Sequence, residues 1–309
     1  MMRVRFTERL RSNIADVSGE LTGDQWQSFS RAVSGEWEGV CCVFTGRGHL
    51  LEIPELYVPA AFREWDVTLY DWQTQASSTV REGTFTRMSK QLMPTAGCEA
   101  DAVAFEEEIQ EAGNTPGSGL APLPDGGYSI GPTALDSSKK ELAEHCVPVG
   151  DGYRVRVSQS LRNWTGAPGK WSVAEVKVFE EEFEGEYNAG TELFACGAGT
   201  RKLSDREALD AAKELAGDWV VAEGYPCTWA GAEGAGDAEE WLGGVRAGGE
   251  GVVMLPGGAW SRVTASEAGV MIEAGVMERG GSGRVVVWRR WYDGQGQLTG
   301  IAAARLTKG

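Results

Sequence analysis

The sequence predicts an all-β fold, either a sandwich or a barrel, in two consecutive domains that each begin with a short helix. Three observations lead to this prediction. A helix followed by Gly-x-Trp occurs twice, each half ends in two strand-like runs joined by a tight turn, and short strand candidates with glycine-rich turns lie in between. The chain has 309 residues, which is long enough for two domains with separate cores.

The repeat is an ungapped match between residues 21–37 (LTGDQWQSFSRAVSGEW) and residues 203–219 (LSDREALDAAKELAGDW). Each copy opens with a capping box, because the hydroxyl of Thr22 or Ser204 can accept a hydrogen bond from the amide three residues on, where a Gln or Glu can bond back to the cap. An apolar stripe at helical spacing follows, and then a glycine suited to a left-handed C-cap. The same cap, helix, stop and tryptophan in two places indicate two homologous domains.

Each half ends in a predicted antiparallel hairpin. In the first half, residues 153–161 and 170–179 flank a Gly/Pro turn, and in the second half residues 283–306 flank Asp-Gly-Gln-Gly. The further strand candidates are residues 62–72, 78–88, 251–260 and 268–280.

These elements divide the chain into an arm and two domains. Residues 1–20 are expected to be a disordered arm or part of a transit peptide. The N-terminal domain is expected at residues 21–190 and the C-terminal domain at residues 200–309. Residues from about 94 to 150, which are rich in Gly, Pro and acid, are expected to be a long insertion in the N-terminal domain.

Three more stretches are expected at the surface. The Gly/Ala/Glu-rich stretch 230–251 predicts a mobile loop. The glutamate runs at 106–108 and 180–184 predict solvated faces rather than metal or partner sites.

The formal net charge of −16 disfavours nucleic acid and anionic membranes as partners, since both require a basic face. No apolar run is long enough for a membrane-spanning helix, so no membrane insertion is expected. The six cysteines show neither C-x-x-C nor the paired spacing of a zinc site. We expect free thiols, although an even count also allows disulfides, and we expect no metal and no cofactor.

The sequence offers little for catalysis, because it holds two histidines, His49 and His145. Any Ser-His-Asp or Cys-His arrangement must use one of them. No nucleophile elbow, metalloprotease, P-loop or dinucleotide-binding pattern occurs. His145 and Cys146 are neighbours on a predicted strand and should point to opposite faces. Carboxylates are abundant, but nothing selects a catalytic pair, so we expect no enzyme and no catalytic residue.

The short helix, the Gly-x-Trp on a first strand and an arginine near the last strand resemble the calycin superfamily of lipocalin-like barrels. The resemblance implies two tandem antiparallel calycin-like β-barrels, each preceded by a short α-helix. It further implies that the tryptophan closes one end of its barrel and that an arginine lies across its ring, whose quadrupole attracts the cation. The barrel-closing residues that it implies are Trp37 with Arg156 or Arg154, and Trp219 with Arg289 or Arg290.

The chain is more specifically similar to the double-calycin DUF3598 family of cyanobacteria, algae and plants. The similarity rests on QWQSFSRAVSGEWEGVCCVFTGRGHLLE at 25–52, LPGGAW at 255–260 and WYDGQG at 291–296. Because the family includes a chloroplast ATP-synthase biogenesis factor, the similarity implies a non-enzymatic assembly or chaperone-like role at the catalytic head of that enzyme. It implies ATP synthase subunits as protein partners, and the chloroplast stroma as location, or the cytoplasm of a bacterium.

Four of the twelve tryptophans are candidate contacts for a ligand or partner. Trp65 and Trp72, like Trp288 and Trp291, are an odd number of residues apart and should point to opposite faces of an ideal strand. At least one of each pair is then exposed, unless a bulge resets the alternation. Exposed tryptophans indicate a docking patch or a pocket for a tetrapyrrole, lipid or fatty acid; packing between the barrels is the third reading. The alternative function is therefore a lipocalin-like carrier of a small hydrophobic ligand.

Overall fold

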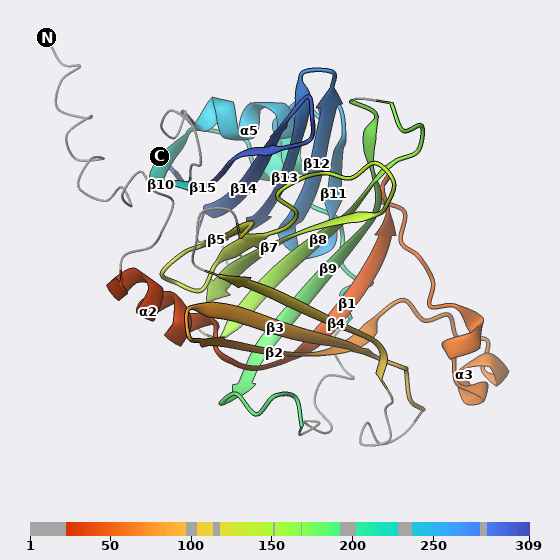
Figure 1. Ribbon diagram of the computed structural model, residues 1–309. Coiled ribbons are helices and arrows are strands. Elements are labelled where there is room, and N and C mark those ends of the chain that lie inside the picture. Colours follow the sequence, from red (N-terminus) through yellow and green to blue (C-terminus); the bar gives the residue numbers. More distant parts are fainter. Residues whose placement is uncertain are drawn as a thin grey trace, which may run out of the picture.

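The computed structural model describes residues 23–96, 104–113, 118–150, 152–167, 169–191, 202–227, 237–278 and 283–309. In these residues the chain forms two antiparallel β-sheets that pack against each other, with short helices at the periphery (Figure 1). The prediction of an all-β, calycin-like fold is confirmed. The arm at 1–20 and Thr22 of the first capping box lie outside the described residues.

The first sheet has nine strands within the described residues, in the order β4-β3-β2-β1-β9-β8-β7-β6-β5. Its strands are β1 (Gly35–Thr45), β2 (Trp72–Arg81), β3 (Thr84–Leu92), β4 (Ala104–Gly113), β5 (Leu120–Pro122), β6 (Tyr128–Ile130), β7 (Glu141–Gly150), β8 (Tyr153–Asn163) and β9 (Trp171–Gly185). Strand β1 pairs with both β2 and β9, so the last strand returns beside the first, as closure of a barrel requires.

Side chains close the remaining gap between the outer strands β4 and β5, which are not paired with each other in the described residues. Phe85 of β3 shares one apolar cluster with Leu120 of β5 and Tyr128 of β6. Helix α2 (Gly23–Val33) adds Phe29 to this cluster and covers the same end of the sheet. The first sheet is therefore a nearly closed barrel with an apolar plug at one end.

The second sheet has six strands in the described residues, in the order β10-β15-β14-β13-β12-β11. Its strands are β10 (Trp219–Cys227), β11 (Val252–Leu255), β12 (Ala259–Ser266), β13 (Gly269–Met277), β14 (Arg284–Asp293) and β15 (Leu298–Lys308). Helix α4 (Ala211–Glu214) precedes β10, and the 3-10 turn η4 (Pro256–Gly258) joins β11 to β12. Helix α5 (Ala238–Arg246) packs Trp241, Leu242 and Val245 into the cluster that fills the inner face of this sheet.

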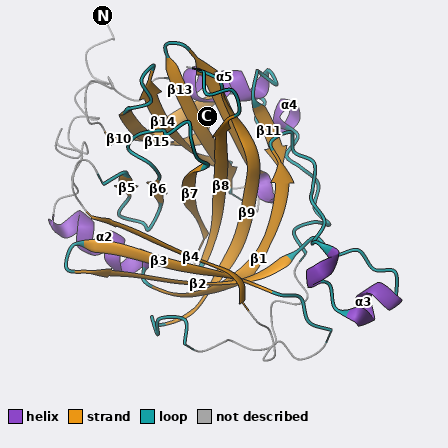
Figure 2. Cartoon of the chain, turned by 45° about the vertical axis from the view of Figure 1, so that its right-hand side comes forward, coloured by secondary structure: helices purple, strands orange, loops and turns teal. Residues whose placement is uncertain are grey.

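The two sheets meet through their outer faces (Figure 2). One apolar cluster joins Val40 of β1, Val157 of β8 and Val178 of β9 with Ile272 of β13 and Trp288 of β14. Because side chains alternate along a strand, these residues point away from the interior of their own barrel. The central strands of the first barrel are therefore buried on both faces.

Hydrogen bonds cross the same interface. The side-chain amide of Gln159 on β8 donates to Ser261 Oγ at 2.8 Å and to the Glu273 carbonyl at 2.9 Å. The indole of Trp288 donates to the carbonyl of Cys146 at 3.3 Å. These three hydrogen bonds tie strands β7 and β8 of the first barrel to β12, β13 and β14 of the second and help to set the position of one barrel against the other.

The repeated Gly-x-Trp has the same local geometry in both halves. The Trp37 indole donates to the carbonyl of Val33 at 3.4 Å, and the Trp219 indole donates to the carbonyl of Leu215 at 3.0 Å. Each tryptophan therefore occupies a carbonyl that the end of the preceding helix leaves unpaired. The glycine in each copy has positive φ, which is 92° at Gly217.

The second copy of the predicted helix is shorter than expected. Ser204 does not cap a helix, because its amide donates to the carboxylate of Asp71 at 3.0 Å and its hydroxyl bonds the same group. The helix starts instead after Asp210, whose side chain accepts from the amide of Lys213 at 3.2 Å. A contact to the first barrel thus replaces the predicted capping box at 204.

Three predicted loops or strands are wrong. The described residues of 94–150 supply strands β4 to β7 of the barrel. Residues 62–72 do not form a strand, because α3 (Ala60–Glu64) ends at a turn in which Asp66 has φ of 53°. Within 230–251, Asp237 caps helix α5 by accepting from the Glu240 amide at 3.0 Å.

Arg290 on β14 is fully buried between the barrels and has no carboxylate partner among the described residues. Its guanidinium donates to the carbonyls of Gly119 at 2.9 Å and Pro132 at 3.2 Å, and to Ser129 Oγ at 3.1 Å. Its Nε donates to the hydroxyl of Tyr292 at 3.1 Å. A cation of the second barrel therefore donates hydrogen bonds to backbone carbonyls on both sides of the β5–β6 hairpin of the first.

Replacing Arg290 by Met should lower the free energy of unfolding by about 3 kcal/mol, because the buried carbonyls of Gly119 and Pro132 and the hydroxyl of Ser129 each lose a charge-assisted hydrogen bond. Urea unfolding monitored by tryptophan fluorescence measures the change. Arg284→Met is the matched control, since Arg284 begins the same strand but is exposed. Equal losses in the two variants would show that Arg290 does not join the barrels.

Candidate functional site

The interior of the first barrel holds a buried ion-pair network. Arg154 and Arg156 on β8 both bind Glu181 on β9, with Nε to Oε2 distances of 2.6 and 2.9 Å. Arg156 also donates to Glu181 Oε1 at 2.6 Å and to Glu144 Oε2 of β7 at 2.7 Å. All four side chains are almost completely buried. The prediction that the run 180–184 is a solvated face is thus wrong for Glu181.

Glu144 extends the network to the other side of the barrel. Arg87 Nε on β3 lies 3.0 Å from Glu144 Oε1, and the hydroxyl of Tyr128 donates to the same oxygen at 2.8 Å. Arg87 also reaches Glu108 on β4 at 3.1 Å. The network therefore connects both halves of the sheet across the interior, and its three arginines face three glutamates.

Aromatic rings cover the arginines of this network. The guanidinium carbon of Arg154 lies 3.9 Å from the centroid of the Trp37 ring, and that of Arg156 lies 4.0 Å from the Phe179 ring. Of the two arginines expected near Trp37, Arg154 is the one on its ring. The terminal nitrogens of Arg154 make no hydrogen bond in the described residues, and the ring face supplies their electrostatic partner.

The network is sealed at both ends. The α2 cluster with Phe29 and Tyr128 covers one end. At the other end, Cys41 and Phe179 pack against Ile53 and Val58 from the β1–β2 connection. The charges therefore lie in a region of low dielectric constant, where an ion pair is strong and an unpaired charge is costly.

The network fixes the ionisation of its members. Burial alone would raise the pKa of Glu181, but Arg154 and Arg156 outweigh it and lower the pKa to about 2. The same balance lowers the pKa of Glu144. Burial raises the pKa of the neighbouring Cys146 thiol to about 12 despite the arginines, so it is neither acidic nor nucleophilic. Carboxylates held ionised cannot act as general acids, and the arrangement suits a structural role.

The inner face of the second sheet carries a smaller version of this arrangement. Glu273 accepts from Arg289 Nε at 2.6 Å and from the Trp260 indole at 3.0 Å. Arg289 lies 4.3 Å over the ring of Trp241. The expected contact of Arg289 with Trp219 is wrong, because helix α5 supplies Arg289 with the Trp241 ring and with the carbonyls of Glu240 and Trp241.

The cation near Trp219 is Lys308 on β15, at 5.6 Å from the ring centroid. Register explains this exchange, because Trp219 pairs with Lys308 at the end of the β10–β15 ladder. The other arginine expected near Trp219, Arg290, points to the opposite face of β14 and into the interface between the barrels.

Two of the four candidate contact tryptophans lie on β14. Trp288 is fully buried between the barrels, where its ring stacks on His145 at 6.5 Å. Trp291 lies on the opposite face, partly buried against the cluster of the second sheet. Cys146 points into the first barrel, away from His145, as expected for neighbours on a strand. In the described residues no hydrogen bond is seen between a histidine side chain and a Ser, Thr or Cys side chain, and His49 lies exposed after the turn that follows β1.

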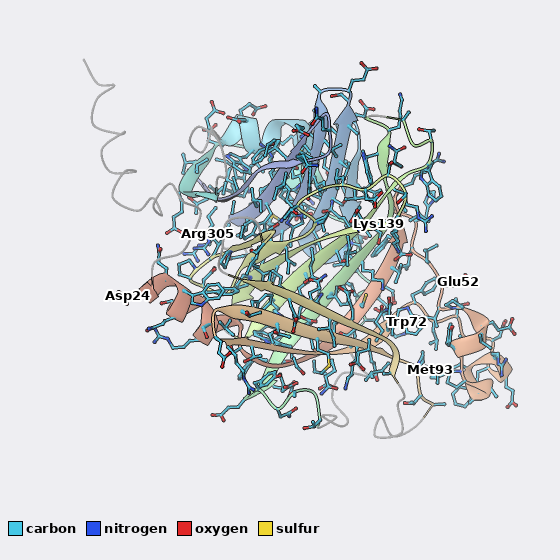
Figure 3. All side chains as sticks on the ribbon, viewed as in Figure 1. Asp24, Glu52, Trp72, Met93, Lys139 and Arg305 are labelled. Carbon is cyan, nitrogen blue, oxygen red and sulfur yellow. The ribbon has the colours of Figure 1, made fainter. Side chains whose placement is uncertain are left out.

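The other two candidate tryptophans lie in or next to residues 46–71, which we term the projecting segment. It contains the 3-10 turn η1 (Glu55–Tyr57) and α3, and both stand away from the two sheets (Figures 1 and 2). Trp72 directly follows the segment (Figure 3). It is buried, and its ring lies 6.0 Å from that of Tyr57. Trp65 and Leu56 are 63% and 84% exposed. The segment thus presents apolar side chains to solvent.

The sequence reasoning missed Glu181, Glu144 and Arg87. One signal was available, since Arg154 and Arg156 alternate with valines on a strand whose other face had to be buried. Alternation predicts that such arginines point inward, and buried arginines need carboxylates on neighbouring strands. Which carboxylates serve depends on strand register, which one sequence does not reveal.

Among the residues that the structure describes, no three His, Cys, Asp or Glu side chains form a group that could hold a metal ion. No helix in this part of the chain is long and apolar enough to cross a membrane. Cys41, Cys42 and Cys146 are free thiols.

Comparison with solved structures identifies the fold. A DUF3598-family protein of unknown function from Nostoc punctiforme aligns with a TM-score of 0.53 over 92% of this chain and 99% of its own, at 15% identity. The fold is that of a DUF3598 protein. At this identity the likeness concerns the fold alone, and it agrees with the resemblance seen in the sequence.

No further comparison indicates a fold or a family for this chain. An acyl-CoA hydrolase from Agrobacterium tumefaciens aligns over 70% of this chain and 77% of its own, at 12% identity and a TM-score of 0.13, which is too low to indicate a common fold. No protein-family model and no curated protein matches the chain.

Replacing Glu181 by Gln should destabilise the protein by about 3 to 5 kcal/mol, because it leaves Arg154 and Arg156 buried with too little negative charge. Chemical unfolding measures the loss. Glu182→Gln is the control, because Glu182 follows Glu181 on β9 but points to the other side of the strand, where it accepts a hydrogen bond from the exposed Tyr153. This substitution should lower the free energy of unfolding by less than about 1 kcal/mol. A small effect at Glu181 would mean that the network does not support the barrel.

His145 should make the protein less stable in weak acid. Burial first, and then Arg290, lower the pKa of His145 to about 3. Below its usual value of about 6.5, the unfolded chain therefore binds a proton that the folded chain refuses, and stability is lost as pH falls. Between pH 6.5 and 5 the loss should be about 1.5 kcal/mol.

Unfolding at a series of pH values measures this slope. His145→Leu should flatten it in that window, above the range in which carboxylates titrate. His49→Leu is the control, since His49 is exposed, and should leave the slope in place. An unchanged slope in His145→Leu would assign the acid sensitivity to other groups.

Proposed function

We propose that this protein is a non-enzymatic binding protein that docks a partner protein through the projecting segment. The observation that carries the proposal is the exposure of Leu56 and Trp65 on that segment. Large exposed aromatic and aliphatic side chains are costly in water, and they are typical anchors at the centre of protein interfaces. Leu51 and Val67 of the same segment are also exposed.

The segment holds these side chains in place before a partner arrives. Ile53 and Val58 are buried in the mouth of the first barrel, where they anchor η1 and the start of α3. Trp65 packs edge to face on Phe62 at 5.8 Å between ring centroids. An anchor whose rotamer is already restrained loses less entropy on binding.

The charges around the anchors favour a basic partner surface. Glu52, Glu55, Glu64 and Asp66 are exposed on the segment. Arg63 offsets part of this charge and lies 4.0 Å from Glu55. The whole chain carries −16. A partner with an apolar pocket and a rim of lysine or arginine would complement this surface and associate rapidly.

The proposed target, the catalytic head of the ATP synthase, rests on the resemblance of the sequence to the DUF3598 family, which includes a chloroplast ATP-synthase biogenesis factor. In a plant or alga this target places the protein in the chloroplast stroma, and in a bacterium in the cytoplasm. The barrel interiors support protein docking over transport of an apolar ligand, because the first contains paired charges and the second contains Trp219, Trp241 and Trp260.

The test is binding of the purified chain to isolated α, β and γ subunits of the ATP synthase. The double variant Leu56→Ser, Trp65→Ser should bind at least about 30-fold more weakly, the effect of losing roughly 2 kcal/mol at a hot spot. Trp164→Ser is the matched control, because Trp164 is 68% exposed but belongs to the β8–β9 turn.

The outcomes separate the target from the surface. Absence of binding by the unaltered chain to all three subunits would reject the ATP synthase as the target. Binding that Trp164→Ser weakens as much as the double variant would reject the projecting segment as the docking surface.

A further inference from the structure

A cleft of about 260 Å³ lies where the two barrels meet. Its described lining includes no residue of the buried ion-pair network or of the projecting segment. Four connections line it: the β6–β7 and β8–β9 connections of the first barrel and the β12–β13 and β14–β15 turns of the second. The last of these is the Asp-Gly-Gln-Gly turn of the WYDGQG stretch. Neither barrel forms the cleft alone, and ligand sites are frequent at such junctions.

Glycines let the connections approach and hold the cleft open between them. A Cβ at Gly169 would lie 2.3 Å from the carbonyl carbon of Ser266, on the facing turn of the other barrel, and Gly169 has φ of 68°. A Cβ at Gly294 would lie 2.4 Å from the carbonyl oxygen of Glu267. The turns therefore touch backbone to backbone, so the cleft exists without a ligand.

The side chains of the cleft have a distinct chemistry. Trp171 is partly buried, because it packs against the apolar cluster between the barrels and also lines the cleft. Asp293 is the single charged side chain among the described lining residues. Its Oδ1 accepts from the amides of Gln295 at 2.8 Å and Gln297 at 2.9 Å, while Oδ2 has no hydrogen bond within the described residues.

The remaining polar side chains are uncharged. Ser137, Ser266, Gln295 and Asn163 line the cleft and carry hydroxyls and amides. The absence of lysine and arginine from the described lining disfavours an anionic ligand. An aromatic platform surrounded by neutral hydrogen-bonding groups and one carboxylate suits a molecule with a C–H face and several hydroxyls.

We propose that this cleft binds a neutral saccharide, whose C–H face packs on Trp171 and whose hydroxyls donate to Asp293 and exchange hydrogen bonds with Gln295 and the serines. A volume of 260 Å³ has room for a ligand of on the order of ten non-hydrogen atoms, the size of one sugar ring. With so few contacts the affinity is in the millimolar range. The site is independent of the projecting segment.

The experiment is saturation-transfer NMR and titration calorimetry on the full chain. The neutral probes are glucose, galactose, N-acetylglucosamine and sorbitol; choline and glucose 6-phosphate test a cation and an anion. We expect at least one neutral sugar to bind, and Trp171→Ala to weaken it at least tenfold. Gln295→Ala, an exposed position, should weaken it several-fold without loss of folding, which thermal unfolding checks.

Trp65→Ala is the control, because Trp65 is exposed on the projecting segment and should leave sugar binding unchanged. A loss in Trp65→Ala equal to that in Trp171→Ala would overturn the location of the site. Failure of every neutral probe at millimolar concentration, or preferential binding of choline or glucose 6-phosphate, would overturn the ligand class. None of these results depends on whether a protein partner binds the projecting segment.

Discussion

The pairing of Glu181 with Arg154 and Arg156 is the interaction on which the first barrel depends. It joins β8 to β9 side by side, and through Glu144 it reaches β7 and β3 across the interior. The centre of a barrel of this size has to be filled by side chains from its own strands. Paired charges under aromatic rings fill it, and the apolar layers at both ends keep water away from them.

The same strands serve a second purpose on their outer face. Because side chains alternate, every inward arginine of β8 is followed by an outward Val155 or Val157 that packs against the second sheet. Alternate residues of the same strand therefore form the charged interior of the first barrel and its apolar interface with the second. A one-residue slip of β8 would place arginines between the barrels and valines in the polar centre, so the register is strongly specified.

The fold class, the helix before β1 and both terminal hairpins could be predicted, because they rest on local periodicity and turn residues. The opposite placement of Trp288 and Trp291 followed from alternation alone. The predictions that failed depend on contacts between residues far apart in the sequence. Ser204 binds Asp71 instead of capping a helix, and the strand register places Lys308 rather than an arginine beside Trp219. Strands β4 to β7 were missed because their composition resembles loops, and only pairing with neighbours makes them extended.

Both sheets are completed by their last strand, since β1 pairs with β9 and β10 pairs with β15. During synthesis, β1 therefore lacks its partner β9 until residue 185 has left the ribosome, and β10 lacks its partner β15 until residue 308 has been made. Until then each nascent barrel has an open strand edge that invites intermolecular pairing. Long-range closure of this kind gives a high contact order, so each barrel is expected to fold slowly once its last strand is available.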